Sequence, residues 1–237
     1  MKVLIGCETS GTVRDAFLER GHDAWSCDVL PSDTPTNRHI QDDIRNVMQD
    51  DWDLLMVAHP PCTRLCNSGV RWLHKAPPNR TLPEMWAELD EGAELFSSVW
   101  NVPHISMVAV ENPVMHKHAK ERIRNYVPFA QSVQPWEFAK SDDSGDNVKK
   151  RTCLWLKNLP KLNRTGSLDR LHETSATSWG QVQIVGSSGQ SFTRALLMRW
   201  LCSGGLWHDL ASRVYGPSEP RTPSHLVGGQ AVSGGGV

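Results

Sequence analysis

Short apolar runs alternate with amphipathic stretches along most of the chain. Five of these runs are too short for helices, and most are bounded by Gly, Asp or Pro, which predicts buried strands. They cover residues 2–5, 22–27, 54–58, 105–110 and 152–156. Helices are predicted between and after these strands, over residues 12–20, 83–100, 116–126 and 191–202. Strands that alternate with helices predict an α/β fold, with a mostly parallel sheet and helices on both faces.

The remaining segments are less regular. Residues 30–39 are expected to form a loop, and a short helix is expected after Asp42-Asp43-Ile44. Residues 64–83 contain several prolines and basic residues and are expected to form a mobile segment. The C-terminal residues are rich in Gly, Ser and Pro, which predicts a flexible tail. One domain is therefore expected over residues 1–202, followed by an extension at 203–215 and the tail at 216–237.

Composition supports a folded protein and shows an uneven charge distribution. The 237 residues are 39% hydrophobic and 22% charged, which excludes a disordered or collagen-like chain. The formal net charge is only -1, yet residues 1–146 hold 14 Lys and Arg against 22 Asp and Glu. Residues 147–237 hold 11 basic residues against 4 acidic ones. This division indicates an anionic partner for the C-terminal part of the chain.

The cysteines and the first residues of the chain indicate the cellular compartment. No apolar run approaches the length of a membrane span, and the first residues become polar too soon for a secretory signal. Six scattered cysteines in a chain of this size indicate reduced thiols, so a cytoplasmic protein without a membrane partner is expected. Cys62 and Cys66 are spaced C-x3-C with no second pair, and no metal site is predicted.

Gly, Pro, Cys and acidic residues follow several of the predicted strands, where each strand ends. Parallel α/β sheets bind ligands at the carboxyl ends of their strands, so one site assembled from several strand ends is expected there. The turn Gly6-Cys-Glu-Thr-Ser-Gly11 would let a ligand approach the backbone, although glycine turns often serve only to connect a strand and a helix. Asp28, about 20 residues further on, is either a ribose acceptor or a solvated turn residue. Together they indicate a nucleoside-bearing cofactor.

Cys62 is the strongest candidate for chemistry. It follows two prolines at the end of an apolar strand, where a stiff backbone would present the thiol to a cleft. A nucleophilic cysteine needs thiolate character and a partner acid or base, whereas most free cysteines are buried and structural. Glu111, at the end of the next predicted strand, would lie beside it. The alternatives for Glu111 are a helix cap or a salt bridge.

These residues resemble, in order and spacing, the motifs of the cytosine-C5 methyltransferase family. The segment DLLMVAHPPC ending at Cys62, followed by Asn67-Ser68-Gly69, is similar to the catalytic motif, and Val110-Glu111-Asn112-Pro113 is similar to its Glu-Asn-Val motif. The turn from Gly6 with Asp28 resembles the S-adenosylmethionine pocket. Three further stretches resemble the remaining motifs more faintly, namely Asp42-Asp43-Ile44, Asn147-Val-Lys149-Lys-Arg151 and Gly189-Gln190-Ser191-Phe192.

The resemblance implies a function and a set of site residues. The fold would be the Rossmann-like fold of S-adenosylmethionine-dependent methyltransferases, and the reaction would be methyl transfer to C5 of cytosine in DNA, with the base flipped out of the duplex. The implied catalytic residues are Cys62, Glu111 and Arg151. The implied cofactor-binding residues are Gly6, Glu8, Ser10, Gly11, Asp28, Asp43 and Pro60. The implied substrate-binding residues are Pro61, Arg64, Asn112 and Lys149.

The chain also departs from the family pattern. Thr63 stands where the family has Gln after Pro-Cys, and Cys66 is a second thiol in the loop. Only residues 152–188 separate Arg151 from the last motif, where family members that read a DNA sequence carry a large recognition domain. A separate recognition subunit is therefore a possible partner. Two alternatives stay open, a non-catalytic or partner-dependent relative that binds nucleic acid or S-adenosylmethionine, and an enzyme acting on RNA or a nucleotide. A compact enzyme of this kind would suit a bacterium, or a phage acting in its host's cytoplasm.

Overall fold

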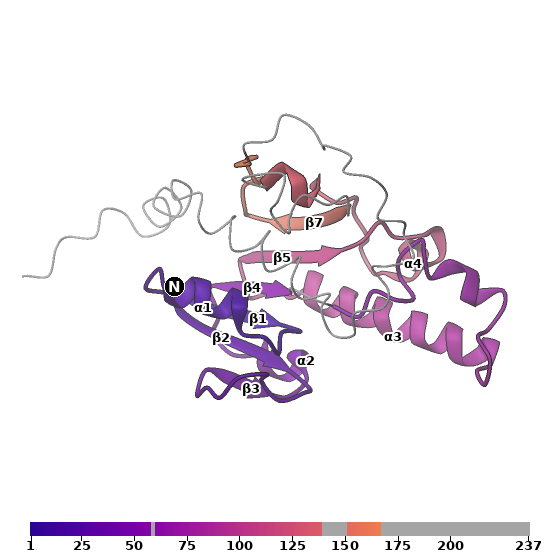
Figure 1. Ribbon diagram of the computed structural model, residues 1–237, viewed down its shortest axis with the longest axis horizontal. Helices are drawn as coiled ribbons and strands as arrows, with labels where there is room; N and C mark the ends of the chain where they lie inside the picture. Colours follow the sequence, from indigo (N-terminus) through magenta and orange to yellow (C-terminus); the bar gives the residue numbers. More distant parts are fainter. Residues whose placement is uncertain (58–59, 139–150, 167–237) are drawn as a thin grey trace, which may run out of the picture. The chain divides into compact units, whose positions relative to one another are not determined.

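The computed structural model describes residues 1–57, 60–138 and 151–166. Within these residues seven strands form one sheet: β1 (Lys2–Gly6), β2 (Asp23–Asp28), β3 (His39–Gln41), β4 (Leu54–Val57), β5 (Met107–Asn112), β6 (Gln131–Val133) and β7 (Thr152–Lys157). Their order across the sheet is β3-β2-β1-β4-β5-β7-β6. The strands from β3 to β5 are parallel, and β7 runs antiparallel to both β5 and β6 (Figure 1). The predicted α/β fold with a mostly parallel sheet is confirmed.

The strand order places a crevice at a defined point of the sheet. The chain runs from β1 outward to β3 and then crosses back to β4 on the other side of β1. At such a reversal the connections from the two neighbouring strands leave in opposite directions, which opens a crevice at their carboxyl ends. The segments after β1 and β4 both begin at this point.

Four α-helices and two 3₁₀ helices connect the strands: α1 (Thr12–Leu18), α2 (Ile44–Val47), α3 (Leu82–Trp100), α4 (Lys117–Arg122), and the 3₁₀ turns Val70–Leu73 and Pro135–Phe138. The longest of them, α3, begins with a capping box. The Thr81 hydroxyl accepts from the Glu84 amide, and the Glu84 carboxylate accepts from the Thr81 amide. Pro83 lies in the first turn, where a helix needs no amide donor.

The helices cover both faces of the sheet. Leu4, Leu55 and other strand residues pack in one buried cluster with side chains from α2, α3 and α4. Cys27 points into this same cluster, so its neighbour Ser26 must point to the opposite face. There the Arg14 guanidinium of α1 donates to the Ser26 hydroxyl at 3.0 Å. Hence α1 lies on one face, and the other three α-helices lie on the second.

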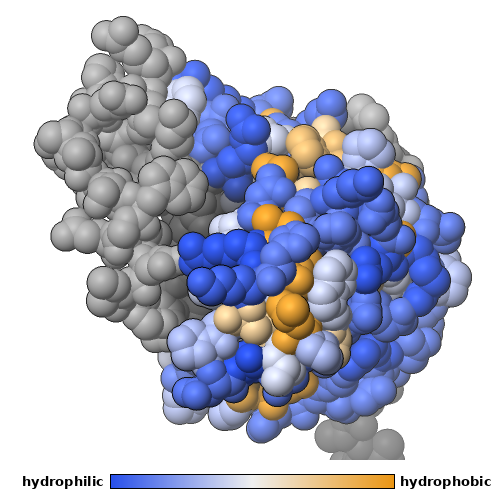
Figure 2. Space-filling view, turned by 90° about the vertical axis from the view of Figure 1, so that its right-hand side faces the viewer, coloured by the Kyte–Doolittle hydropathy of each residue, from blue (hydrophilic) through white to orange (hydrophobic). Residues whose placement is uncertain are grey.

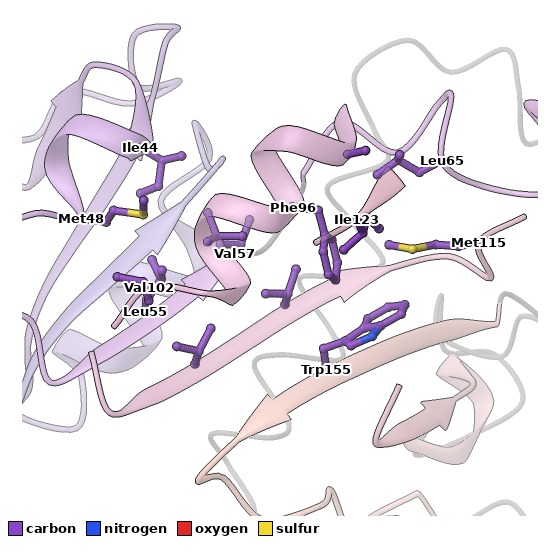
Figure 3. Close-up of a cluster of buried hydrophobic side chains, with 14 of the residues drawn as sticks. Ile44, Met48, Leu55, Val57, Leu65, Phe96, Val102, Met115, Ile123 and Trp155 are labelled. Carbon is purple, nitrogen blue, oxygen red and sulfur yellow. The ribbon is translucent and has the colours of Figure 1, made fainter. Parts of the chain in front are cut away.

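The larger part of the core lies between α3 and the strands. Figure 3 shows Phe96 of α3 pointing toward the sheet, with Trp155 of β7 beside it. The two rings meet edge to face, with their centroids 5.1 Å apart. Leu65 and Met115, from the segments that follow β4 and β5, pack at one end of the same cluster. The core therefore reaches the segments that carry the candidate site.

Three expectations from the sequence were wrong in detail. The strand predicted at 105–110 runs from Met107 to Asn112, so Glu111 lies inside β5 rather than after it, because β7 pairs with it that far. The loop predicted at 30–39 ends in β3, a three-residue edge strand without an apolar run. The segment at 64–83 is not a free excursion, because Leu65 and Leu73 are buried in the core.

Several predicted features lie outside the described residues. These are the helix at 191–202, the extension at 203–215, the tail at 216–237, the motif at 189–192 and Lys149. In the part of the chain that the structure describes, no helix is both long enough and apolar enough to cross a membrane.

Candidate functional site

A pocket of about 400 Å³ opens at the carboxyl ends of β1 and β2. Its walls come from Cys7 after β1, from Asp28 at the end of β2, from the start of α2, from Pro61, Thr63 and Arg64, and from one side of α3. The strands β4 and β5 point toward the face shown in Figure 2, where hydrophobic residues are visible among hydrophilic ones. The volume lies within the range of small-molecule sites. The predicted meeting of several strand ends therefore encloses a space that can hold a ligand.

Two of the predicted cofactor residues line this pocket. One Asp28 oxygen accepts from the Leu30 amide at 3.0 Å, which holds the carboxylate in a turn at the pocket edge. Asp43 caps α2 by accepting from the Arg45 amide at 2.8 Å, and it forms an ion pair with the Arg45 side chain. These hydrogen bonds from Arg45 lower the pKa of Asp43. Asp28 is thus the carboxylate with more capacity left for a ligand.

The turn from Gly6 to Gly11 has a different role from the one predicted. The Glu8 carboxylate is 1% exposed and accepts from the Val13 amide at 2.7 Å and the Arg14 amide at 3.2 Å. The Ser10 hydroxyl donates to Glu8 at 3.3 Å. Burial raises the pKa of Glu8, although these hydrogen bonds oppose the rise. Glu8 and Ser10 satisfy the first amides of α1 and are not among the pocket-lining residues.

Close packing explains why both ends of this turn are glycines. A Cβ on Gly6 would lie 2.8 Å from the Ile44 side chain, so the absence of a side chain lets α2 approach β1. Gly11 has φ +70°, and a Cβ there would meet the Arg14 guanidinium at 2.1 Å. Burial raises the pKa of Cys7 to about 12, so the thiol between these glycines is neutral in the pocket wall. Pro60 is not among the lining residues, whereas Pro61 is.

Cys62 begins a tight helical turn. Its carbonyl accepts from the Leu65 and Cys66 amides, both at 3.0 Å, and the Gly69 amide then donates to the Cys66 carbonyl at 2.9 Å. A Cβ on Gly69 would lie 1.8 Å from the Thr63 carbonyl oxygen, so only glycine lets the turn close this tightly. Cys62 is half-buried and Cys66 is 7% exposed. Cys62 is therefore the more exposed of the two cysteines.

The Cys62 turn is fastened to the segment that follows β5. The Asn67 amide donates to the Val114 carbonyl at 3.0 Å, and the His116 amide donates to the Leu65 carbonyl at 3.1 Å. The His116 ring adds a third link, because its Nε2 lies 2.6 Å from the Arg64 carbonyl oxygen. Its Nδ1 accepts from the Ala119 amide at 3.1 Å, which leaves the ring proton on Nε2. The turn is thus fixed beside the segment that continues Glu111-Asn112.

The links that fasten the Cys62 turn carry almost no signal in the sequence. Apart from the His116 ring, their members are backbone amides and carbonyls, which any residue supplies, and His116 was included only in the helix predicted over residues 116–126. The one local signal is the position of His116 directly before α4, since its ring caps that helix. The contact with Arg64 joins residues 52 positions apart and carries no sequence pattern.

The candidate residues of β5 and β7 come together through strand pairing. Asn112 pairs with Cys153 and Glu111 with Leu154, so Arg151 follows the same edge beyond β5. Burial raises the pKa of Cys153 to about 11, with Arg151 opposing the rise and Glu111 adding to it. Both charges therefore act on the same buried thiol. The sheet thus brings Glu111 and Arg151, two of the implied catalytic residues, into one neighbourhood.

Asn112 is buried inside the protein, whereas Arg64 is held by an ion pair in the pocket wall. Asn112 is fully buried, and neither its amide nitrogen nor its amide oxygen has a hydrogen-bond partner among the described residues. Arg64 donates from Nε to Glu88 of α3 at 2.6 Å, and Arg80 forms an ion pair with the same carboxylate. Both arginines, with Arg80 the stronger, lower the pKa of Glu88. Arg64 thus belongs to the pocket wall rather than to a free basic loop.

Comparison of the chain with protein-family models gives no match, and comparison with curated proteins gives none either. The chemistry of the site therefore has to be inferred from its own parts. These are the pocket with Asp28, the turn with Cys62 and Cys66, and the adjoining ends of β5 and β7.

Proposed function

We propose that the protein is an enzyme that transfers a methyl group from S-adenosylmethionine to C5 of cytosine in DNA, with Cys62 as the nucleophile. The observation that carries the proposal is the fastening of the Cys62 turn to the segment that directly follows Glu111-Asn112. It sets a half-buried cysteine and a carboxylate on neighbouring strand ends, beside a pocket of cofactor size. A thiol nucleophile and a nearby acid are what covalent activation of a pyrimidine requires.

The pocket suits a nucleoside-bearing cofactor. Asp28 stands at its edge with a carboxylate that can accept hydrogen bonds from ribose hydroxyls. Ile44 and Leu95 offer apolar surface for an adenine ring, and Gly92 leaves room on α3. S-adenosylmethionine, when bound, supplies the methyl group. Pro61 and Thr63 belong to the same wall, so a ligand there would lie next to the Cys62 turn.

The chain's own residues would divide the remaining work. The Cys62 thiolate would add to C6 of cytosine, which makes C5 nucleophilic toward the methyl group. It would leave again as a thiolate when C5 loses its proton to solvent water. Glu111 would hold N3 and the exocyclic amine and stabilise the charge that develops on the ring. Arg151, with Lys149, would support the cytosine carbonyl. A target base within a duplex would first have to be flipped out of the stack.

Trapping with 5-fluorocytosine DNA tests the proposal directly. A fluorine at C5 cannot leave as a proton does, so the Cys62 adduct should persist after methyl transfer. We expect a covalent protein–DNA complex that depends on S-adenosylmethionine, that is seen by denaturing electrophoresis and that maps to Cys62 by mass spectrometry. Cys62→Ala should abolish the complex, while Cys202→Ala, which changes a cysteine outside all the candidate motifs, should not.

Parallel reactions distinguish the alternatives. An adduct on 5-fluorocytosine RNA or nucleotide but not on DNA would transfer the proposal to that substrate. Cofactor binding without any adduct, on every substrate offered, would instead favour a non-catalytic or partner-dependent binding protein.

The pocket assignment has its own prediction. Asp28→Ala should weaken S-adenosylmethionine binding at least tenfold, because each hydrogen bond to a charged group contributes about 1.5–3 kcal/mol. Isothermal titration calorimetry on the purified protein measures this without any nucleic acid. Asp23→Ala is the matched control, since Asp23 lies at the opposite end of the same strand and is exposed. Equal affinities for the wild type and Asp28→Ala would show that the cofactor does not occupy this pocket.

A further inference from the structure

Arg64 is a pocket-lining cation with unused hydrogen-bonding capacity. Its Nε donates to Glu88 of α3 at 2.6 Å, and its side chain is 12% exposed. The two terminal nitrogens form no hydrogen bond among the described residues, yet neither of them is enclosed by protein atoms. A guanidinium that is held by Nε presents two parallel N–H groups on its remaining edge, and these match the two oxygens of a carboxylate.

The α3 wall beside Arg64 also offers a carboxylate. Glu88 itself is occupied, because one of its oxygens accepts from Arg64 and the other from Arg80. Glu91 lies three residues further along α3, on the same side of the helix, and lines the same pocket. Among the described residues it forms neither an ion pair nor a hydrogen bond. A guanidinium edge and a carboxylate are thus available within one helical turn of each other.

Arg45, the second arginine that lines the pocket, is already used within the protein. Its Nε donates to both oxygens of Asp43, at 2.9 and 3.0 Å, and a terminal nitrogen pairs with the same carboxylate. The Arg45 side chain is 42% exposed, so water screens its charge more than that of Arg64. Arg64 is therefore the cation from which an anionic group in the pocket gains most.

The two sides of the pocket differ in chemistry. Asp28 ends β2, whereas Pro61, Thr63 and Arg64 follow β4, and β1 lies between these two strands in the sheet. The Asp28 side suits ribose hydroxyls. The Arg64 side combines a cation with an anion, which complements the carboxylate and ammonium groups of an α-amino acid. S-adenosylmethionine carries a nucleoside and an α-amino acid on the two sides of its sulfonium.

We propose that Arg64 binds the α-carboxylate of S-adenosylmethionine and that Glu91 binds its ammonium group, an inference that rests on the proposed function. Family resemblance implied a contact of Arg64 with the substrate, whereas its position in the pocket wall favours a contact with the cofactor. In this arrangement the amino-acid part of the cofactor lies against the segment that contains Cys62. The sulfonium between the two recognised ends is then held beside the Cys62 turn.

Two ligands that differ by one group test the Arg64 contact. Decarboxylated S-adenosylmethionine keeps the sulfonium and the ammonium group and lacks only the carboxylate. By isothermal titration calorimetry, the wild type should bind S-adenosylmethionine about tenfold more tightly than the decarboxylated ligand, since a charge-assisted pair is lost. Arg64→Gln should weaken S-adenosylmethionine by about the same factor and should not weaken the decarboxylated ligand. Arg64→Lys keeps the charge without the forked donors and should give an intermediate result.

Arg80→Gln is the matched control. Arg80 pairs with the same Glu88 carboxylate but is not among the pocket-lining residues, so both affinities should stay at the wild-type values. Thermal unfolding shows whether the variants fold, and the comparison of the two ligands on the wild type needs no variant. Glu91→Gln should weaken both ligands, because both carry the ammonium group. It should leave unchanged the affinity for 5′-methylthioadenosine, which lacks the amino-acid group.

The possible failures are distinguishable. Equal affinities of the wild type for the two ligands would overturn the Arg64 contact and leave the proposed function in place. An equal loss for both ligands in Arg64→Gln would do the same, because the arginine would then act on the shape of the pocket and not on a carboxylate. Wild-type affinities in Glu91→Gln would overturn the ammonium contact. If the wild type binds no S-adenosylmethionine at all, the proposed function fails, and the Arg64 and Glu91 contacts fail with it.

Discussion

Glu111→Gln is expected to lower kcat for cytosine methylation by about 10²–10⁴-fold, the range for general acid–base catalysis. The amide has nearly the shape of the carboxylate and can still form hydrogen bonds to N3 and the exocyclic amine. It cannot carry the negative charge or exchange a proton with the ring as the Cys62 adduct forms. The loss should therefore appear in kcat, with KM for DNA changing much less. A filter-binding assay with radiolabelled S-adenosylmethionine measures both constants.

Two comparisons make the Glu111 result specific. Glu121→Gln alters an exposed carboxylate on α4 and should leave kcat unchanged. Cofactor affinity should be the same in the wild type and in Glu111→Gln, because Glu111 is not among the pocket-lining residues. A wild-type kcat in Glu111→Gln would remove Glu111 from the mechanism and leave its position beside the Cys62 turn without a catalytic explanation.

Trp155→Ala is expected to lower the free energy of unfolding by about 3–5 kcal/mol, the usual cost of removing a large aromatic side chain from a core. Trp155 is 1% exposed, and its ring packs edge to face on Phe96 at 5.1 Å and on Phe129 at 5.9 Å. Its indole N–H donates to the Val127 carbonyl at 2.8 Å. The substitution would leave a cavity and remove this hydrogen bond.

Urea unfolding followed by far-UV circular dichroism measures this loss, because ten tryptophans complicate a fluorescence signal. Trp155→Phe keeps an aromatic ring and should cost clearly less. Trp136→Ala removes a half-buried tryptophan and should also have the smaller effect. Equal losses for Trp155→Ala and Trp136→Ala would show that the contact between β7 and α3 does not determine the stability of the core. Methyl transfer should fall with Trp155→Ala as well, since β7 begins next to Arg151.

The strand pattern was well predicted from the sequence because it is a local property. Apolar runs such as Leu54–Val57 must be buried on both faces of a parallel sheet, so they carry a recognisable signature. The short edge strand β3 has no such run and was missed. The end of β5 was misplaced because its last two residues, Glu111 and Asn112, are polar and join the sheet only through pairing with β7.

The candidate site was predicted in outline and corrected in its particulars. The gathering of Asp28, Cys62 and Glu111 at one edge follows from the rule that parallel strands end on the same side. The role of Glu8 could not be predicted, because its carboxylate is used to satisfy the first amides of α1. The ion pair of Arg64 with Glu88 could not be predicted either, because Glu88 lies on a helix 24 residues further along the chain.

By itself, then, the sequence determined the α/β class, most of the strands and the edge of the sheet where unusual residues meet. Only the tertiary structure decided which side chains face the pocket, and how the Cys62 turn is fastened to the segment after β5. It also decided that Cys66 is buried one helical turn after Cys62, with the Ser68 hydroxyl 3.0 Å from its sulfur. The physical reason is the same in each case. The pattern of apolar positions that become buried can be read directly from the sequence. Hydrogen bonds between distant backbone segments cannot, because they use amides and carbonyls that nearly every residue carries.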